Sequence, residues 1–315
     1  MKILGIGNAI VDVICKVDDS FIDQNNLTKS TMKLFFDEKE FKSLLANLRI
    51  EKTVSGGSVA NSIVGISQLG NQVGFIGKVS DDEFGSKYEE GLKKENVDYF
   101  YSKKKEELPT GTCLILVTPD AERTMCTFLG TAGKINDKDI NSNAVKQSEI
   151  TFLEGYLWDE GDPKKAFDKA ITHSKRVAMS LSDLFCVERH KDEFISLIKN
   201  YVNILFGNDQ EIEALLNGQA KEKISSIVEI AVVTNGPKGA NIFKANDSIF
   251  IPPIDGLDVL DTTGAGDLFA AGFLFGFSKK LTLDDCGKLA TKSASHIIQQ
   301  YGARPVESLS KLLIT

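Results

Sequence analysis

One segment of the chain combines a glycine turn with a carboxylate at the start of an apolar helix. Asp261-Thr262-Thr263-Gly264-Ala265-Gly266-Asp267 leads into an apolar run that predicts a helix over 267–277. A helix that begins after small residues presents unpaired amides and its positive dipole end to the turn, so Gly264, Ala265 and Gly266 predict an anion site. The dipole keeps a first-turn carboxylate ionised, which makes Asp267 a proton acceptor at neutral pH without a raised pKa. The alternative is a glycine-rich helix cap in which Asp267 only neutralises the dipole.

A second glycine turn, Ser55-Gly56-Gly57-Ser58-Val59-Ala60-Asn61, also precedes a predicted helix. The paired glycines Gly56 and Gly57 allow a polyol to lie against the backbone. Asn61, one turn into the helix, can donate to and accept from hydroxyl groups. The alternative is a simple helix start that Ser58 caps, with no ligand.

The N-terminal segment Gly5-Ile6-Gly7-Asn8-Ala9-Ile10-Val11-Asp12 places Gly-x-Gly after a predicted strand. A dinucleotide-binding fingerprint needs a third glycine at position 10, where this chain has Ile10. We therefore exclude that site and interpret Asp12 as a bidentate partner for two sugar hydroxyls.

Two further turns are candidates for a nucleotide site, because the P-loop pattern GxxxxGK[ST] is absent. Asn208 and Glu211 open a helix after a predicted strand, near the expected position of a triphosphate and of Mg²⁺ that is bound through water. Thr234, Gly236 and Gly239 follow the next strand, in a turn that can approach phosphate oxygens. Each turn could also be an ordinary connection.

The elements that must position these residues alternate between short apolar runs and amphipathic stretches, which predicts a doubly wound α/β fold. We expect central strands over 2–6, 73–76, 150–153, 177–180, 204–206 and 230–234. We expect helices over 58–68, 84–95, 163–174, 209–216 and 267–277. Segments 13–36 and 97–128 are richer in alternating, strand-like residues and predict antiparallel strands of a small lid.

Composition limits the class of protein. With 42% hydrophobic and 26% charged residues among 315, the chain is typical of one globular domain. A net charge of −7 argues against a nucleic-acid partner. The cysteines form no CxxC pair, the N-terminus has no cleavable leader pattern, and the longest apolar run is about half of the roughly 20 residues that span a bilayer. We therefore expect a cytoplasmic protein with no membrane partner.

The ordered motifs Gly56-Gly57 with Asn61, Asn208-x-x-Glu211, Thr234-x-Gly236-x-x-Gly239 and 261–267 closely resemble those of the PfkB-type, ribokinase-like carbohydrate kinases. The resemblance covers nearly the whole chain. It implies a single kinase domain over 1–315, an α/β/α sandwich with a small β-strand lid, and a monomer or homodimer.

For the site, the resemblance implies Asp267 as catalytic base, with the amides of Gly264, Ala265 and Gly266 at the transferring phosphoryl. It also implies ATP, with Thr263 among its contacts, and Mg²⁺ held by Glu211 through water. A monovalent cation such as K⁺ is implied beside Asp261.

Within the family, the segments 7–12, 122–130 and 301–305 are most similar to bacterial adenosine kinases. This branch implies adenosine as the acceptor, bound by Asn8, Asp12 and the second glycine turn. Phe128, Phe35 or Phe36 could stack on a purine, or could only seal the lid. A ribokinase- or fructokinase-like sugar kinase and a non-catalytic nucleoside sensor remain alternatives.

Overall fold

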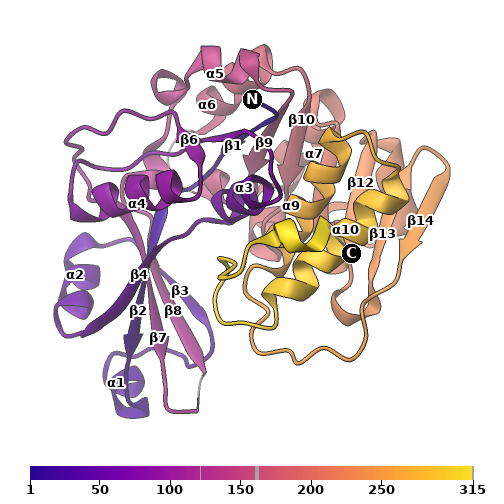
Figure 1. The fold of residues 1–315 in the computed structure, drawn as a ribbon. Coiled ribbons are helices and arrows are strands. Elements are labelled where there is room, and N and C mark those ends of the chain that lie inside the picture. Colours follow the sequence, from indigo (N-terminus) through magenta and orange to yellow (C-terminus); the bar gives the residue numbers. More distant parts are fainter. Residues whose placement is uncertain (121, 160–162, 314–315) are drawn as a thin grey trace.

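The computed structural model describes residues 1–120, 122–159 and 163–313, and within these ranges nine strands form one sheet (Figure 1). In sheet order its strands are Asp247–Ile251 (β14), Ala240–Lys244 (β13), Ile230–Thr234 (β12), Ile204–Asn208 (β11), Val177–Ser180 (β10), Ile150–Glu154 (β9), Ile3–Ile6 (β1), Val73–Ile76 (β5) and Val97–Tyr99 (β6). All neighbours from β12 to β6 are parallel, and β13 and β14 extend the sheet in antiparallel fashion. The six predicted central strands all lie in this sheet.

Helices cover both faces of the sheet, which is why its central strands are buried at every position. Alternate residues of β1 enter different cores, with Ile3 on one face and Leu4 on the other. The Ile3 face packs against Ser58–Gln68 (α3), Glu83–Lys94 (α4), Ala265–Ser278 (α9) and Leu283–Ile297 (α10). The Leu4 face packs against Ser142–Gln147 (α5), Pro163–His173 (α6), Leu184–Tyr201 (α7) and Asp209–Leu215 (α8). Short 3-10 turns occupy Ala132–Lys134, Asp137–Asp139, Gly155–Asp159, Lys221–Ser226, Gly236–Lys238 and Leu309–Leu313.

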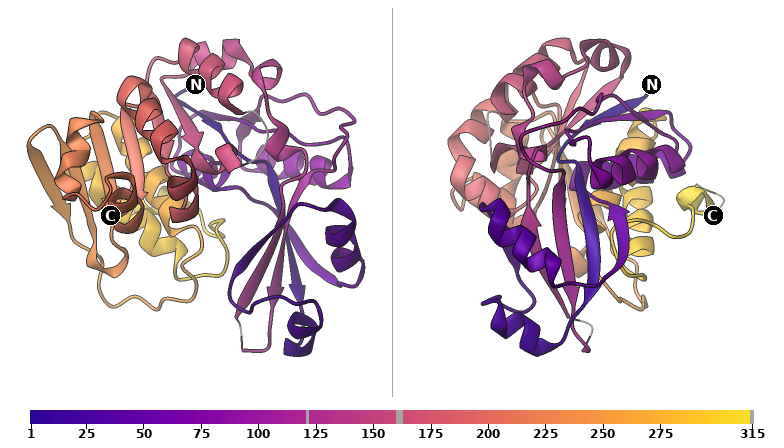
Figure 2. Two further views of the ribbon diagram at one scale, coloured as in Figure 1. Left: turned by 180° about the vertical axis from the view of Figure 1, so that it is seen from behind. Right: turned by 90° about the vertical axis from the view of Figure 1, so that its left-hand side faces the viewer.

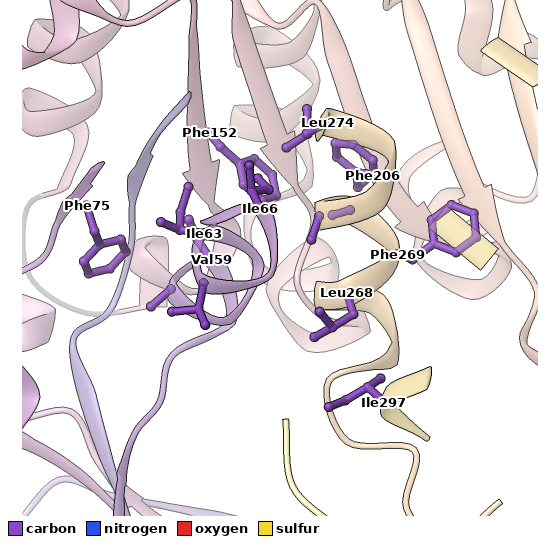
Figure 3. Packing of buried hydrophobic residues seen from close by; sticks show 14 of the residues in the cluster. Val59, Ile63, Ile66, Phe75, Phe152, Phe206, Leu268, Phe269, Leu274 and Ile297 are labelled. Carbon is purple, nitrogen blue, oxygen red and sulfur yellow. The ribbon is translucent and has the colours of Figure 1, made fainter. Parts of the chain in front are cut away.

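The helices α3 and α9 lie side by side on the sheet, as Figure 3 shows for Val59, Ile63 and Leu268. Gly65 makes this approach possible. A Cβ at Gly65 would lie 2.7 Å from Leu268 Cδ1 and 2.9 Å from the Cβ of Ala271. The contact brings the N-terminal ends of the two helices, and therefore the two glycine turns, to one edge of the sheet.

A second, five-stranded sheet projects from the body and forms the lid (Figures 1 and 2). Its order is Met32–Phe35 (β3), Arg123–Phe128 (β8), Gly111–Val117 (β7), Ile10–Lys16 (β2) and Ile50–Ser55 (β4). Asp19–Gln24 (α1) and Glu38–Ala46 (α2) belong to the same part of the chain.

The lid differs from the sequence expectation in extent and in strand direction. It begins at Ile10 and includes β4, whereas Val97–Tyr99 pairs with β5 in the large sheet. Pairs β2–β7 and β3–β8 are parallel, so the small sheet is mixed rather than antiparallel. Ala121, inside the expected segment 97–128, lies outside the described residues. Over the described ranges, none of the helices has both the length and the apolar character needed to cross a membrane.

Candidate active site

Asp267 lies in the first turn of α9, where its carboxylate accepts two hydrogen bonds from α3. Ser58 Oγ donates to Oδ1 at 2.6 Å, and Asn61 Nδ2 donates to Oδ2 at 2.8 Å. Ser62 Oγ also donates to the Asp267 carbonyl at 2.8 Å. Two motifs that are about 200 residues apart in the sequence therefore meet at one carboxylate.

The pKa of Asp267 differs from the sequence expectation. Burial raises the pKa of this carboxyl, while the hydrogen bonds from Ser58 and Asn61 and the charge of Arg304 act in the opposite direction. The expectation of an ordinary pKa was wrong, because desolvation outweighs the groups that stabilise the anion. A raised pKa makes a carboxylate a stronger base near neutral pH.

The glycine turn before α9 is open towards the site. Gly264 is left-handed at φ 82°, and a Cβ there would lie 2.7 Å from Ala303 Cα. At Gly266 a Cβ would meet nothing within 4 Å, so a ligand can approach this backbone. The amides of Gly266 and Asp267 have no helical carbonyl four residues earlier. Ala265 N donates to the Thr262 carbonyl at 3.1 Å, so the expectation that this amide is free for an anion was wrong. The turn thus has the geometry that binds an anion.

Asp12 and the second glycine turn lie against each other. Gly57 has φ 96°, and a Cβ at Gly56 would lie 2.4 Å from Asp12 Oδ2. Burial raises the pKa of Asp12 to about 7, the charge of Arg304 lowers it, and the charge of Asp267 raises it. The structure therefore brings Asp12, Gly56, Gly57 and Asp267 into one site.

Glu154, at the carboxyl end of β9, belongs to the same site and was missed in the sequence. It is 1% exposed, and it accepts from Val59 N at 2.9 Å, Asn8 N at 3.2 Å and Asn8 Nδ2 at 3.0 Å. Burial raises its pKa to about 7, although these donors lower it. An acidic residue directly after an apolar strand was the available signal. The Asn8 amide group thus points to Glu154, so Asn8 supports the glycine turn rather than offering that group to a ligand.

Asn208 and Glu211 form a reciprocal helix cap at the start of α8. Glu211 N donates to Asn208 Oδ1 at 2.9 Å, and Asn208 N donates to Glu211 Oε2 at 3.0 Å. Burial raises the pKa of Glu211 to about 7, and the charge of Asp183, a second carboxylate that the sequence reading missed, raises it further. Asp183 caps α7 by accepting from Cys186 N.

Thr234 lies beside this cap, because Asn208 and Thr234 are register partners in β11 and β12. Gly236 is at φ 50° with open space where a Cβ would be. Gly239 is at φ 90°, and a Cβ there would lie 2.3 Å from the Ile251 carbonyl oxygen. Packing alone therefore requires glycine at 239, whereas 236 is free to face a ligand.

Carboxylates of the kind that hold Mg²⁺ occur at Glu211 and Asp183, but they form no complete cage. Within the described ranges no cluster of three or more His, Cys, Asp or Glu side chains is arranged for a metal ion. Mg²⁺ usually keeps several waters and takes its other ligands from substrate phosphates. The two carboxylates therefore fit an ion that arrives with a nucleotide.

The Asp261 carboxylate is engaged by protein donors on both oxygens. Arg123 Nη1 and Gly302 N donate to Oδ2 at 2.6 and 2.7 Å, and Thr263 N and Oγ1 donate to Oδ1 at 3.1 and 2.7 Å. A guanidinium already balances this charge, so the arrangement does not fit a monovalent cation bound by this carboxylate. Thr263 likewise directs its hydroxyl to Asp261.

Phe128 does not face the acceptor site. It is 5% exposed and stacks on Phe41 of α2 at 5.4 Å, and Phe35 packs on the same ring. These rings fill the lid's own core, so the purine-stacking role is not supported for Phe128 or Phe35. Phe36 is 75% exposed.

Apolar residues lie on the face of the lid that carries Asp12. Asp12 of β2 lies beside Cys113 of β7, and two residues further along these strands Ile14 lies beside Ile115. On the other side of β7, Ile115 lies beside Met125 of β8. Because side chains two residues apart share a face, these residues flank Asp12. Ile14, Ile115 and Met125 are half-buried, as expected for side chains that border an open site.

Comparison with known proteins agrees with this geometry. The pfkB family carbohydrate kinase model matches residues 9–309. The chain is 35% identical to adenosine kinase from Sinorhizobium meliloti, with a TM-score of 0.90 over 99% of this chain and 98% of that one. It is 36% identical to a probable sugar kinase from Rhizobium etli, with a TM-score of 0.89 over 99% and 97%. A nucleoside kinase from Methanocaldococcus jannaschii is 29% identical over 257 residues, 79% of this chain and 80% of that protein.

Proposed function

Because the chain belongs to the PfkB family of carbohydrate kinases, we propose that it transfers the γ-phosphoryl group of ATP to a hydroxyl of adenosine, giving AMP. The observation that carries this proposal is the position of Asp267. Its carboxylate is held by Ser58 and Asn61, next to Asp12 and to the open amides of the glycine turn.

In the proposed reaction, the acceptor hydroxyl oxygen attacks the γ-phosphorus in line with the bond to ADP, which breaks. The hydroxyl proton passes to Asp267, whose two hydrogen bonds leave lone pairs for it. The amides of Gly264, Gly266 and Asp267 would offset the charge on the phosphoryl oxygens, whereas Ala265 N already donates to the Thr262 carbonyl. Most of the catalysis is therefore positioning and charge stabilisation.

On the donor side, Asn208, Thr234, Gly236 and Gly239 would border the ATP phosphates, with Thr263 at the turn. Glu211 would hold Mg²⁺ through water, and this ion would offset negative charge on the ATP phosphates. The register pairing of Asn208 with Thr234 supports a single donor site.

A nucleoside is favoured over a small sugar by the lid face beside Asp12. Ile14, Ile115 and Met125 present apolar surface that a base can bury, whereas a free pentose has mostly hydroxyl groups to offer. Asp12, Gly57 and Asn61 would hold the ribose. The kinase from Sinorhizobium meliloti, named for adenosine, supports the same choice.

The test is ADP release over a panel of adenosine, guanosine, ribose and fructose. We expect adenosine to have the highest kcat/KM. A preference for ribose or fructose would identify the protein as a sugar kinase. Binding of an acceptor without ADP release would identify it as a non-catalytic sensor.

The role of Asp267 is tested by Asp267→Asn, which should lower kcat by about 10² to 10⁴ while ATP and the acceptor still bind. Asp284→Asn, an acidic residue in the first turn of α10, is the matched control and should keep normal turnover. Near-normal kcat in Asp267→Asn would overturn the assignment.

A further inference from the structure

Arg304 has hydrogen-bond donors that the protein does not use. Its Nε and Nη2 atoms are shielded from solvent, and neither finds a hydrogen-bond partner within the described ranges. Asn61 Oδ1 is unpartnered in the same way, on a residue that donates to Asp267. The charge of Arg304 also acts on Asp267, so unused hydrogen-bond donors and an unused acceptor belong to neighbours of one carboxylate.

Such donors are costly to bury. A buried polar group without a partner loses its hydration and gains nothing in return, and the cost is larger for a charged group. Native structures pair nearly all buried donors, so exceptions call for a specific explanation. A ligand that supplies oxygen atoms is one such explanation.

The loop that carries Arg304 is held in place on three sides. Gln300 Nε2 donates to the Arg304 carbonyl at 2.7 Å, and Gln300 Oε1 accepts from Val306 N at 3.0 Å. Gly302 N donates to Asp261, and Ala303 lies directly against Gly264. The backbone is thus fixed beside the anion turn.

The charged and titratable groups that act on Arg304 come from three elements: Asp12 of β2, Tyr88 and Glu95 at α4, and Asp267 of α9. Desolvation lowers the pKa of Arg304, and these groups raise it. Its charge in turn lowers the pKa of both Asp12 and Asp267. Tyr88 donates to the Gly56 carbonyl at 3.4 Å, which ties α4 to the second glycine turn. The guanidinium therefore lies by the turn and by both carboxylates of the acceptor site.

We propose that Arg304 is an acceptor-binding residue. Its Nε–H and Nη2–H groups donate to the two oxygens of a vicinal diol, and the hydroxyl groups of the same diol donate to the Asp12 carboxylate. A hydroxyl both donates and accepts, so one carboxylate and one guanidinium satisfy a diol from two sides. This inference rests on the proposed kinase function and extends it, because it predicts discrimination against acceptors that lack one hydroxyl of the pair.

The experiment is calorimetric binding of adenosine, 2′-deoxyadenosine and 3′-deoxyadenosine without ATP, beside turnover with ATP. Wild type should bind adenosine more tightly than either analogue. Arg304→Gln should weaken adenosine binding about 10- to 100-fold and bring the three affinities together, with KM for ATP unchanged. If the panel selects a sugar, the same comparison uses that sugar and its deoxy analogues.

Two further measurements separate binding from a structural role. Because burial disfavours the Arg304 charge more than the neighbouring carboxylates favour it, Tm of the ligand-free protein should stay equal or rise. Loss of the positive charge should also move the acidic limb of kcat/KM to higher pH. Arg176→Gln, at an arginine that pairs with Glu229, is the matched control and should change neither.

Wild-type affinity for adenosine in Arg304→Gln would overturn this proposal and leave the kinase function standing. Binding that depends on Arg304 without any phosphoryl transfer would support it and overturn the kinase function. A large fall in Tm with unchanged discrimination would assign Arg304 to structure.

Discussion

Arg123 Nη1 lies 2.6 Å from Asp261 Oδ2, and this ion pair connects the lid to the first residue of the glycine turn. The guanidinium also lies over the Tyr301 ring, with 5.1 Å between Cζ and the ring centroid. Arg123 begins β8, so the pair acts at the end of a lid strand. Both side chains are largely buried, so the contact is shielded from salt more than a surface pair would be.

We expect Arg123→Gln to raise KM for the acceptor about tenfold, because the lid loses a charged hydrogen bond to the body. ATP hydrolysis without acceptor should increase relative to phosphoryl transfer, since a less closed lid admits water. Steady-state kinetics with and without acceptor measure both. Lys33→Gln removes an exposed lid ion pair to Glu40 and is the control; equal effects of the two variants would contradict a latch at Arg123.

The two faces of the lid should respond differently to truncation. Met125→Ala should raise KM for adenosine about fivefold with little change in Tm, because it removes half-buried surface beside Asp12. Phe128→Leu should destabilise the fold by about 1–2 kcal/mol and leave KM unchanged, because it loosens the lid core around Phe41. Kinetics and thermal unfolding of both variants provide the test. A raised KM in Phe128→Leu together with a lowered stability in Met125→Ala would indicate that Phe128, and not Met125, contacts the purine.

Activity and stability should change in opposite directions between pH 8 and pH 6. Asp12 must be ionised to accept from a diol, and its pKa is about 7, so kcat/KM should fall as pH drops through 7. The folded-state pKa values of Asp12 and Glu154 lie above those of ordinary carboxyls, so the native state binds protons more tightly than the unfolded chain. Their contribution to stability is therefore present at low pH and is lost as pH rises through 7.

Tm should accordingly be higher at pH 6 than at pH 8, and Asp12→Asn should flatten this dependence. Parallel pH profiles of turnover and thermal unfolding provide the measurement. Activity that stays constant from pH 8 to pH 6 would show that the pKa of Asp12 lies outside this pH range.

Glu154 should be a positioning residue. Glu154→Gln loses one of the two acceptor oxygens that hold Val59 N and the two nitrogens of Asn8, so at least one buried donor is left without a partner. We expect a loss of about 1–3 kcal/mol in the free energy of unfolding and a higher KM for the acceptor. Chemical denaturation and kinetics measure these, with the exposed Glu149→Gln as control. Unchanged stability would mean that the turn does not depend on Glu154.

The strands and helices of the α/β body could be predicted from the sequence, because hydrophobic residues repeat with a different period in helices than in strands. The buried strands read as unbroken apolar runs, and α3 was predicted with its observed bounds. The strand pairing of the lid was harder to predict, since the alternating pattern of a short strand does not determine which strand it pairs with. Val97–Tyr99 has the same local pattern as a lid strand, yet it pairs with β5.

Within the site, local signals identified Asp267 and Asn61 but not the bond between them. That contact depends on how α3 packs on α9, which no local pattern contains. Glu154 was missed for a similar reason, because its three donors come from other segments. Phe128 was misplaced because the purine argument ignored strand parity: it pairs with Thr112, one residue away from the Cys113 partner of Asp12.

The absence of a side chain at Gly65 has an effect that reaches well beyond its own packing. Gly65 lies seven residues after Ser58, which is about 10 Å along the helix axis. A side chain inserted there would meet Leu268, the residue directly after Asp267, and would push the start of α9 away from α3. Turnover is therefore sensitive to a position that touches no substrate, and the spacing between base and acceptor is set by the closeness of two helices rather than by any loop.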